Sequence, residues 1–330
     1  VRWAWYFKKS STHTKVARSI PLIRDINVLS RELYMDLRDS GELGTFHLER
    51  IGLLMLFQTQ KSGDHEMKTA KKAEGLGLEV SYLDRAGLQQ LEPDVEIDSL
   101  GAIHYECDAH STPPEVMARF KEYLPQRGVA IHSGEAVLDM TLENGRITKL
   151  ITDKGAYQPD EVVLAAGSWT AQLSQKMGIS LPLQAGKGYR INVHEKTGIR
   201  MPAILMEPKM AVTPMNGFTR FAGTMEFSGI NDTIRQERVN AIARGAERFY
   251  KGLRIPQEAK AEAQCGLRPV SPDGLPYIGR SQKVGNLVFA TGHAMMGYSL
   301  GPATGLLVSQ LISEQPLAMD LSPFSPDRKF

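Results

Sequence analysis

Cysteine is almost absent from this sequence of 330 residues, which contains only Cys107 and Cys265. Two cysteines exclude a fold held together by several disulfides and fit a reducing compartment, so we expect a cytoplasmic protein. A charge excess of one sign is also missing, because 39 basic residues oppose 37 acidic ones for a net charge of +2. That balance excludes the basic field typical of nucleic-acid binding and favours small-molecule partners.

Long apolar runs are missing too, and none reaches the roughly 20 residues of a membrane-spanning helix. The longest, IGLLMLF at 51–57, is typical of a buried strand. The sequence begins without methionine, and VRWAWYFKKS resembles a helix already under way. We therefore expect that a first segment of the natural chain is missing.

Helical and strand patterns alternate along the chain, which predicts a mixed α/β protein. Asn144-Gly145 between two alternating runs predicts a β-hairpin. Ser111 or Thr112 should cap the helix that follows them. We expect helices at 20–40, 111–128 and 232–251, a strand at 129–132, and antiparallel strands over 187–227.

The stretch DEVVLAAGSWTAQLSQKMG is the first that suggests a ligand. Its apolar strand from Val162 to Ala165 ends in small residues, and Ser168 should cap a helix that finishes at Gly178. Such a turn at the carboxyl end of a buried strand is where α/β folds admit a phosphate or nucleotide. The residues alone leave open a tight turn without a ligand.

A second stretch, NLVFATGHAMMGYSLGPATGLLVSQLI, predicts a strand at Leu287 to Ala290 and a helix from Gly301 to about Ile312. Gly301 and Gly305 would leave one side of that helix bare. Free N–H groups at its N-terminus would suit a ring carbonyl or an anionic ring. Close packing of helix on strand, which also uses glycine, is the alternative.

The stretch CGLRPVSPDGLPYIG at 265–279 holds one cation, Arg268, before Pro269. A guanidinium is always charged and can bind both oxygens of a carboxylate, which fixes the orientation of a small acid. Pro269 restricts Arg268 to an extended backbone. The residues alone leave open a structural ion pair between domains.

Together these motifs resemble the FAD-dependent D-amino acid oxidase superfamily, and within it the bacterial D-amino acid dehydrogenases and glycine oxidases. The resemblance covers nearly the whole chain and is carried, in order, by VVLAAGSW, LPLQAGKGY, GLRPVSPDGLPYIG, NLVFATGH and GPATG. One family element is missing, the first βαβ unit with G-x-G-x-x-G, because GLGLEV at 75–80 and GKGYRI at 186–191 lack the third glycine.

The resemblance implies a Rossmann-like FAD-binding domain without its first βαβ unit and an inserted antiparallel-sheet substrate domain. The substrate or cap domain would comprise residues 1–110 and 179–262, and the FAD-binding domain residues 111–178 and 263–330.

It further implies oxidative deamination of D-amino acids to 2-oxo acids and ammonia, with hydride passing from the α-carbon to flavin N5. Arg268 would bind the substrate carboxylate, while Tyr189 and Tyr298 would line the substrate cavity. No catalytic residue beyond the flavin and no metal is expected. The residues expected to contact FAD are Val137, Ala165, Ala166, Gly167, Trp169, Gly266, Gly292, His293, Ala294, Met295, Met296, Gly297, Tyr298 and Ser299.

Several points stay open. Met295 stands where glycine oxidases place an arginine, which weighs against a glycine oxidase, although glycine, sarcosine or proline-type amino acids are alternative substrates. Another alternative is a chain that binds no FAD, either truncated or completed by a second polypeptide. The electron acceptor would be a quinone or oxygen. A quinone would bring peripheral contact with the inner membrane, where the basic run KTAKKAEG at 68–75 could lie, although a solvated helix face is its simplest interpretation.

The stretch HYECDAH places His104, Cys107 and His110 three residues apart, a spacing compatible with a metal. The stretch reads as a strand that runs into a loop, and no second cluster accompanies it. We therefore expect no metal from this motif.

Overall fold

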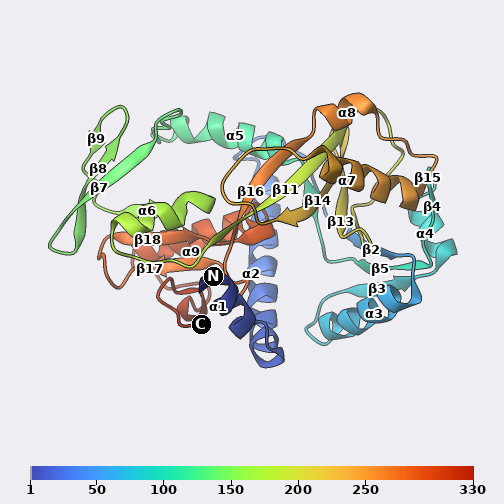
Figure 1. Ribbon diagram of the computed structural model, residues 1–330, viewed down its shortest axis with the longest axis horizontal. Coiled ribbons are helices and arrows are strands. Elements are labelled where there is room, and N and C mark those ends of the chain that lie inside the picture. The colour runs from blue at the N-terminus through green and yellow to red at the C-terminus, as the bar shows by residue number, and fades with distance from the viewer. Residues whose placement is uncertain (1) are drawn as a thin grey trace.

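Two main β-sheets organise the computed structural model, which describes residues 2–330 (Figure 1). The large sheet has eight strands in the order β16-β11-β14-β13-β12-β2-β5-β3, and the small sheet has three in the order β10-β18-β17. The strands of the large sheet are β2 (Leu53–Phe57), β3 (Val80–Leu83), β5 (Gly101–Tyr105), β11 (Gln184–Val193), β12 (Ala203–Leu205), β13 (Met210–Met215), β14 (Phe218–Glu226) and β16 (Gln264–Val270). Those of the small sheet are β10 (Val162–Leu164), β17 (Tyr277–Arg280) and β18 (Leu287–Thr291).

Helices surround both sheets, and short strands pair outside them. The α-helices are α1 (Arg2–Ser10), α2 (His13–Asp39), α3 (Gln60–Glu74), α4 (Arg85–Leu91), α5 (Pro113–Gln126), α6 (Thr170–Lys176), α7 (Gln236–Phe249), α8 (Gln257–Ala261) and α9 (Gly301–Ile312). The 3-10 helices are η1 (Gly167–Trp169), η2 (Ala294–Met296) and η3 (Ser322–Phe324). The remaining strands are β1 (Leu48–Glu49), β4 (Glu96–Ile97), β6 (His110–Ser111), β7 (Val137–Glu143), β8 (Arg146–Thr152), β9 (Ala156–Tyr157) and β15 (Tyr250–Lys251).

Strand β2 shows how the large sheet is buried on both faces. Its side chains alternate, so that Leu54 and Leu56 enter the core beneath α7 while Phe57 packs with Ala70 of α3. Leu54 and Leu56 are completely buried. The part of the apolar run from 53 to 57 is therefore a buried strand, as its composition predicted, whereas Ile51 precedes the strand and is exposed.

The small sheet is covered on both faces along β18, whereas Val163 of the edge strand β10 stays exposed. Strands β10 and β18 run parallel, with Val162 opposite Leu287. Leu287 faces one core with Leu164, while Val288 faces a second core that contains Leu307 of α9 and Ile26 of α2. Burial on both sides explains why β18 reads as a continuous apolar run.

Several expectations are confirmed, namely the mixed α/β class and the helices that became α2, α5, α7 and α9. The hairpin between β7 and β8 turns at Asn144 and Gly145, both with positive φ (50° and 72°), as a two-residue turn with a right-handed strand twist requires.

Two local predictions are wrong. Residues 129–132 form no strand, because they lie exposed and no neighbouring strand pairs with them. Ser168 makes no cap for the helix after it; its Oγ is buried without a hydrogen-bond partner, since the turn closes as η1 before α6 begins.

The predicted domain boundaries remain a prediction. Strand β16, placed in the FAD-binding part from sequence, pairs with β11 in the large sheet. Helix α2, placed in the cap part, packs against α9 beside the small sheet. No helix within residues 2–330 has both the length and the apolar character needed to cross a membrane.

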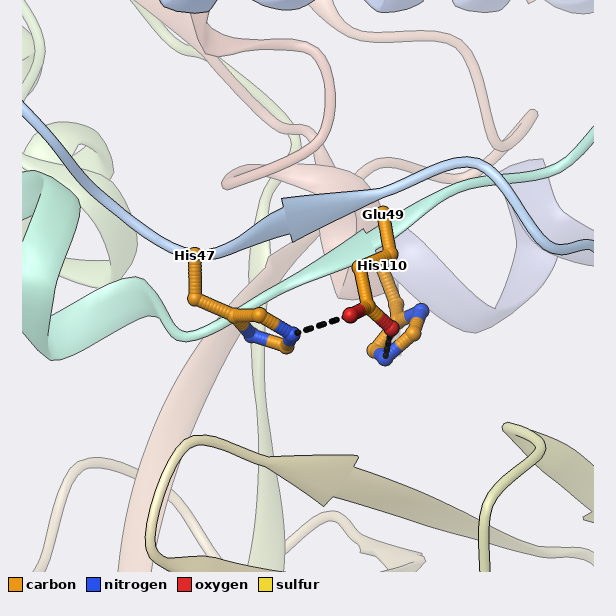
Figure 2. Close-up of side chains that lie close together, drawn as sticks. All are labelled: His47, Glu49 and His110. Atoms are coloured by element: carbon orange, nitrogen blue, oxygen red, sulfur yellow. Dashed lines mark ion pairs between the residues drawn. The ribbon is translucent and has the colours of Figure 1, made fainter.

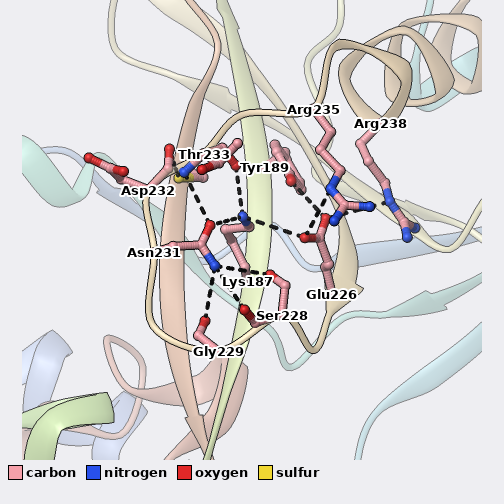
Figure 3. A network of polar contacts seen from close by, with 11 residues as sticks. Lys187, Tyr189, Glu226, Ser228, Gly229, Asn231, Asp232, Thr233, Arg235 and Arg238 are labelled. Carbon is pink, nitrogen blue, oxygen red and sulfur yellow. Dashed lines mark hydrogen bonds and ion pairs between the residues drawn. The ribbon is translucent and has the colours of Figure 1, made fainter.

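A buried polar network lies where β11, β14 and the start of α7 meet (Figure 3). The side chain of Lys187 is 1% exposed, and its Nζ donates to Asn231 Oδ1 at 2.6 Å and to the Thr233 carbonyl at 2.7 Å. Glu226, opposite Lys187 in the strand register, accepts a hydrogen bond from the Tyr189 hydroxyl at 2.8 Å. A loop, two strands and a helix are thereby joined through one lysine and one carboxylate.

Three cations surround the Glu226 carboxylate. Lys187 and Arg235 lie 3.5 Å from its Oε1, and Arg238 lies 3.7 Å from its Oε2. Hydrogen bonds from Ser228 and Tyr189, helped by the charges of Arg235 and Lys187, lower the pKa of Glu226 to about 2. The carboxylate is therefore ionised over the whole physiological range.

Glu226→Gln tests this network. The folded-state pKa of about 2 lies below the ordinary value of 4.5, so the carboxylate stabilises the fold above pH 4.5 and loses this contribution as the pH falls toward 2. The variant should be less stable at neutral pH, because Lys187 stays buried without its counterion. Its stability should also fall less steeply over that acid range. Urea unfolding midpoints across a pH series measure both effects.

Glu96→Gln is the matched control, because Glu96 forms an exposed ion pair with Lys251 at 2.6 Å. That variant should keep the wild-type dependence of stability on pH. A Glu226→Gln protein with the same acid dependence as wild type would contradict the role given to the network.

Candidate functional site

Arg268 lies on β16 with its guanidinium half-buried. Its Nη1 donates to the Thr224 carbonyl at 2.6 Å and lies 3.9 Å from the Met225 sulfur. Burial lowers the pKa of Arg268, and no charged neighbour among residues 2–330 contributes to that shift. Arg268 is thus a partly desolvated cation without a carboxylate partner in the described part of the chain.

Glycine on the neighbouring strand makes room for this side chain. Strand β11 pairs antiparallel with β16, with Gly186 opposite Arg268 and Gly188 opposite Gly266. A Cβ on Gly188 would lie 2.1 Å from both terminal nitrogens of Arg268. The guanidinium therefore rests directly on the backbone of β11, in space that any larger residue would fill.

The carboxyl ends of β10 and β18 lie side by side because the two strands are parallel neighbours. Strand β10 leads into η1 and strand β18 into η2, and β16 packs against both. His293, just before η2, pairs with Val270 of β16 as an isolated bridge. Ligands of α/β folds bind at the carboxyl ends of parallel strands, so this junction is the candidate site.

The predicted cofactor residues of η1 and η2 gather at this junction. Trp169 is 49% exposed and Met295 is 70% exposed, so both leave large apolar surface uncovered. A Cβ on Gly167 or Gly266 would meet no other atom within 4 Å, which leaves open space beside both glycines. The remaining members of the set at this junction are Ala165, Ala166, Gly292, Ala294, Met296, Gly297 and Ser299.

The backbone around η2 is constrained. Gly292 has φ of 79° and Ala294 has φ of 49°, and a Cβ on Gly292 would lie 2.8 Å from the ring of Tyr277. Left-handed backbone in a residue other than glycine is stored strain, which clusters at ligand sites.

His293 is a scaffold residue in this geometry. Its ring is buried, and its Nε2 lies 2.9 Å from the Thr304 hydroxyl on α9. Burial lowers the pKa of His293 to about 4, so the imidazole is neutral at physiological pH. The contact holds the η2 loop against α9.

The two tyrosines predicted to line the substrate cavity make their hydrogen bonds to residues other than Arg268. Tyr189 is buried on the face of β11 opposite Arg268, because side chains alternate along a strand, and its hydroxyl is bonded to Glu226. The hydroxyl of Tyr298 lies 2.6 Å from that of Ser111. Tyr298 and Ser299 line a cavity of about 1010 Å³ beside α2 and α3, and Arg268 is not among its lining residues.

Val137, predicted to meet the adenine, begins β7 in the sheet that projects at the left of Figure 1. It is exposed and lies away from β16. Gly301 and Gly305 leave one side of α9 exposed, as expected, and a Cβ on Gly305 would meet no atom within 4 Å. The Ala303 N–H in the first turn of α9, expected to be free, is instead bonded to α2. Ser30 Oγ accepts from the Ala303 N–H at 3.2 Å and donates to the Ser299 carbonyl at 2.6 Å. Contacts between residues so far apart in the chain leave no local sequence signal.

Sequence reasoning missed the residues that hold Arg268, namely Thr224, Met225 and Gly188. Thr224 has a positive φ of 64°, which turns its carbonyl toward the guanidinium. The alternation Gly-Lys-Gly-Tyr at 186–189 was the available signal, because two glycines on one face of a strand indicate a close approach from that side.

A family model and solved structures match nearly the whole chain. The family model described as FAD dependent oxidoreductase, DAO, matches residues 5–311. The crystal structure of glycine oxidase from Geobacillus kaustophilus superposes with a TM-score of 0.83 at 24% identity, covering 93% of this chain and 83% of that one. The structure of L-proline dehydrogenase from P. horikoshii superposes with a TM-score of 0.80 at 19% identity, covering 91% and 81%. These likenesses confirm the predicted fold class.

Curated relatives are similar over nearly the whole chain. A D-amino acid dehydrogenase of Helicobacter pylori is 27% identical over 313 residues, which is 94% of this chain and 74% of the relative. A D-amino acid dehydrogenase of Bradyrhizobium diazoefficiens is 29% identical over an alignment of 340 positions, which covers 99% of this chain and 79% of the relative. The family and cofactor expected from sequence are confirmed. Because the family model spans most of the described residues, the chain belongs to the DAO family of FAD-dependent oxidoreductases.

Proposed function

We propose that this protein oxidises D-amino acids to 2-oxo acids and ammonia, with Arg268 binding the substrate carboxylate. The supporting observation is the half-buried guanidinium of Arg268, which has no carboxylate partner within residues 2–330. An unpaired cation that has left water is costly unless an anion joins it. The carboxylate of a small amino acid is an anion of the right size and shape.

The choice of D-amino acids rests on two observations. The curated relatives carry the name D-amino acid dehydrogenase at 27% and 29% identity. Met295 stands where, by the resemblance, glycine oxidases have a second arginine, which removes the cation expected for that substrate. An exposed methionine instead offers an adaptable apolar surface to a substrate side chain.

The junction of η1, η2 and β16 suits the ring end of FAD. Open space lies beside Gly167 and Gly266, where no side chain stands in the way of a flat ring. Ser168 Oγ, buried without a partner, is a spare polar group in the same turn. We propose that η1 and the η2 loop hold the flavin, with His293 as the neutral scaffold that fixes the loop on α9.

The chain's own contribution is orientation. When bound, FAD supplies the acceptor for the hydride from the substrate α-carbon. The Thr224 carbonyl accepts one N–H of Nη1 of Arg268, which leaves the second N–H of Nη1 and those of Nη2 free for the two carboxylate oxygens. The substrate ammonium would lose a proton to water, and the α-carbon would then give up its hydride to the acceptor. Water would convert the resulting imino acid to a 2-oxo acid and ammonia. A substrate fixed in contact with its acceptor needs no protein base.

A visible spectrum tests the substrate. The purified protein, incubated with FAD and freed of excess, should show an oxidised flavin band that D-alanine bleaches under anaerobic conditions and L-alanine does not. Adding oxygen or a soluble quinone afterwards identifies the acceptor that restores the band. A band that responds to glycine, sarcosine or proline but not to D-alanine would contradict the proposed substrate, and protein that retains no flavin would contradict the proposed flavin site.

Arg268→Lys tests the carboxylate contact. Lysine keeps the charge but cannot bind two oxygens in one plane, so we expect a loss of about 1.5–3 kcal/mol in substrate binding, or roughly a 10- to 100-fold rise in KM for D-alanine. Arg200→Lys is the control, because Arg200 pairs with Asp94 at 2.6 Å on the surface. Equal KM values for Arg268→Lys and wild type would argue against the contact.

Gly188→Ala tests the space beneath Arg268. A methyl group there would displace the guanidinium, and misplacement by about 1 Å can cost up to about 100-fold in rate. We expect kcat/KM to fall while bound FAD and the unfolding midpoint stay near wild type. Gly155→Ala is the control, because a Cβ on Gly155 meets no atom within 4 Å. Unchanged kcat/KM in Gly188→Ala would refute this packing.

A further inference from the structure

Two short strands bring three metal-ligating side chains together (Figure 2). His47 immediately precedes β1 and lies two residues before Glu49, so both side chains point to the same face. Strand β6 pairs antiparallel with β1, with His110 directly opposite Glu49. Cross-strand neighbours on one face meet, and one ligand atom from each residue lies within 4.8 Å of the other two.

The spacing within this cluster is too wide for direct hydrogen bonds. His47 Nε2 lies 3.6 Å from Glu49 Oε1, and His110 Nε2 lies 3.8 Å from Glu49 Oε2. Two ligands that are each about 2.0–2.1 Å from a tetrahedral Zn²⁺ lie roughly 3.3 Å apart. The three side chains thus surround a space that a metal ion would fill with small rotations.

The surroundings hold one imidazole in place for coordination. His47 Nδ1 lies 2.8 Å from Thr112 Oγ1, which also accepts the Asn216 N–H at 2.8 Å. The backbone N–H of His47 donates to Glu115 Oε2 at 2.8 Å. Ligating histidines are commonly fixed in this way through the nitrogen that does not bind the metal, so Nε2 of His47 remains available.

His110 is a buried ring without a partner for its polar atoms. Its side chain is 7% exposed, its Nδ1 has no hydrogen-bond partner, and its Nε2 approaches only Glu49. Glu49 is 52% exposed and gives the cluster a path to solvent.

We propose that His47, Glu49 and His110 form a binding site for a divalent transition metal, with Zn²⁺ as the best match. Two imidazoles and one carboxylate are a known zinc ligand set that leaves a fourth position for water. Of the three ligands, only His110 is among the residues that line the large cavity beside α2. The site does not depend on Arg268 or on the proposed substrate.

This site departs from the sequence expectation of no metal, and it is not the trio that spacing suggested. His104 lies on β5, outside the cluster, where its Nε2 lies 3.1 Å from the Ile51 carbonyl. Only His110 of HYECDAH joins the cluster, and its partners come from a strand some 60 residues earlier. Spacing along one segment could not reveal ligands on two.

Zinc binding to the whole protein, stripped with a chelator and dialysed, tests the proposal by calorimetry and by metal content. Wild type should bind one Zn²⁺ per chain. Glu49→Gln, which keeps the shape of an exposed side chain, and His110→Ala should each abolish this binding. Thr112→Val should weaken it by about 10- to 100-fold through the orientation of His47.

His104→Ala is the matched control, since it removes a histidine of the same segment outside the cluster. It should bind Zn²⁺ as wild type does. Three outcomes would overturn the proposal: no stoichiometric binding by wild type, equal binding by Glu49→Gln, or loss of binding in His104→Ala. Because Glu49→Gln needs no change in the core, the test holds even if His110→Ala fails to fold.

Discussion

The antiparallel pairing of β11 with β16 is the contact on which the candidate site depends. It places Gly188 beneath Arg268, and it joins the large sheet to the η1 and η2 turns that follow the parallel strands of the small sheet. A register shift by one residue would turn Arg268 to the other face and bring a side chain of β11 beneath it. Chemistry at this junction therefore depends on strand register more than on any single side chain.

The two faces of β11 have different tasks. Gly186 and Gly188 leave one face of β11 without side chains, so that the Arg268 guanidinium fits against the backbone. Lys187 and Tyr189 face the opposite way and join Glu226 in a buried network of hydrogen bonds and ion pairs. Such buried charges contribute to specificity of packing only while every partner is present. The network thus holds β11 and β14 in the arrangement that supports Arg268 on the other side.

Much of the fold and part of the site could be predicted from the sequence. Apolar periodicity located α2, α7 and β2, and Asn144-Gly145 located a hairpin, because these signals reside in a few consecutive residues. The family resemblance rested on motifs that also occupy short segments. Two predictions were wrong. Residues 129–132 form no strand because no other strand pairs with them, and Ser168 does not cap α6 because its turn closes as η1 before α6 begins.

The sequence by itself determined the alternation of elements and the family, and it singled out Arg268 as the cation proposed to bind a small acid, since each depends on local pattern or residue type. Tertiary structure alone decided which face each side chain occupies. It buried Tyr189 away from Arg268, gave the Ala303 N–H of α9 a partner in Ser30 of α2, and brought His110 to His47 and Glu49. These are contacts between distant segments, and pairing register and packing, which no short stretch encodes, decide them.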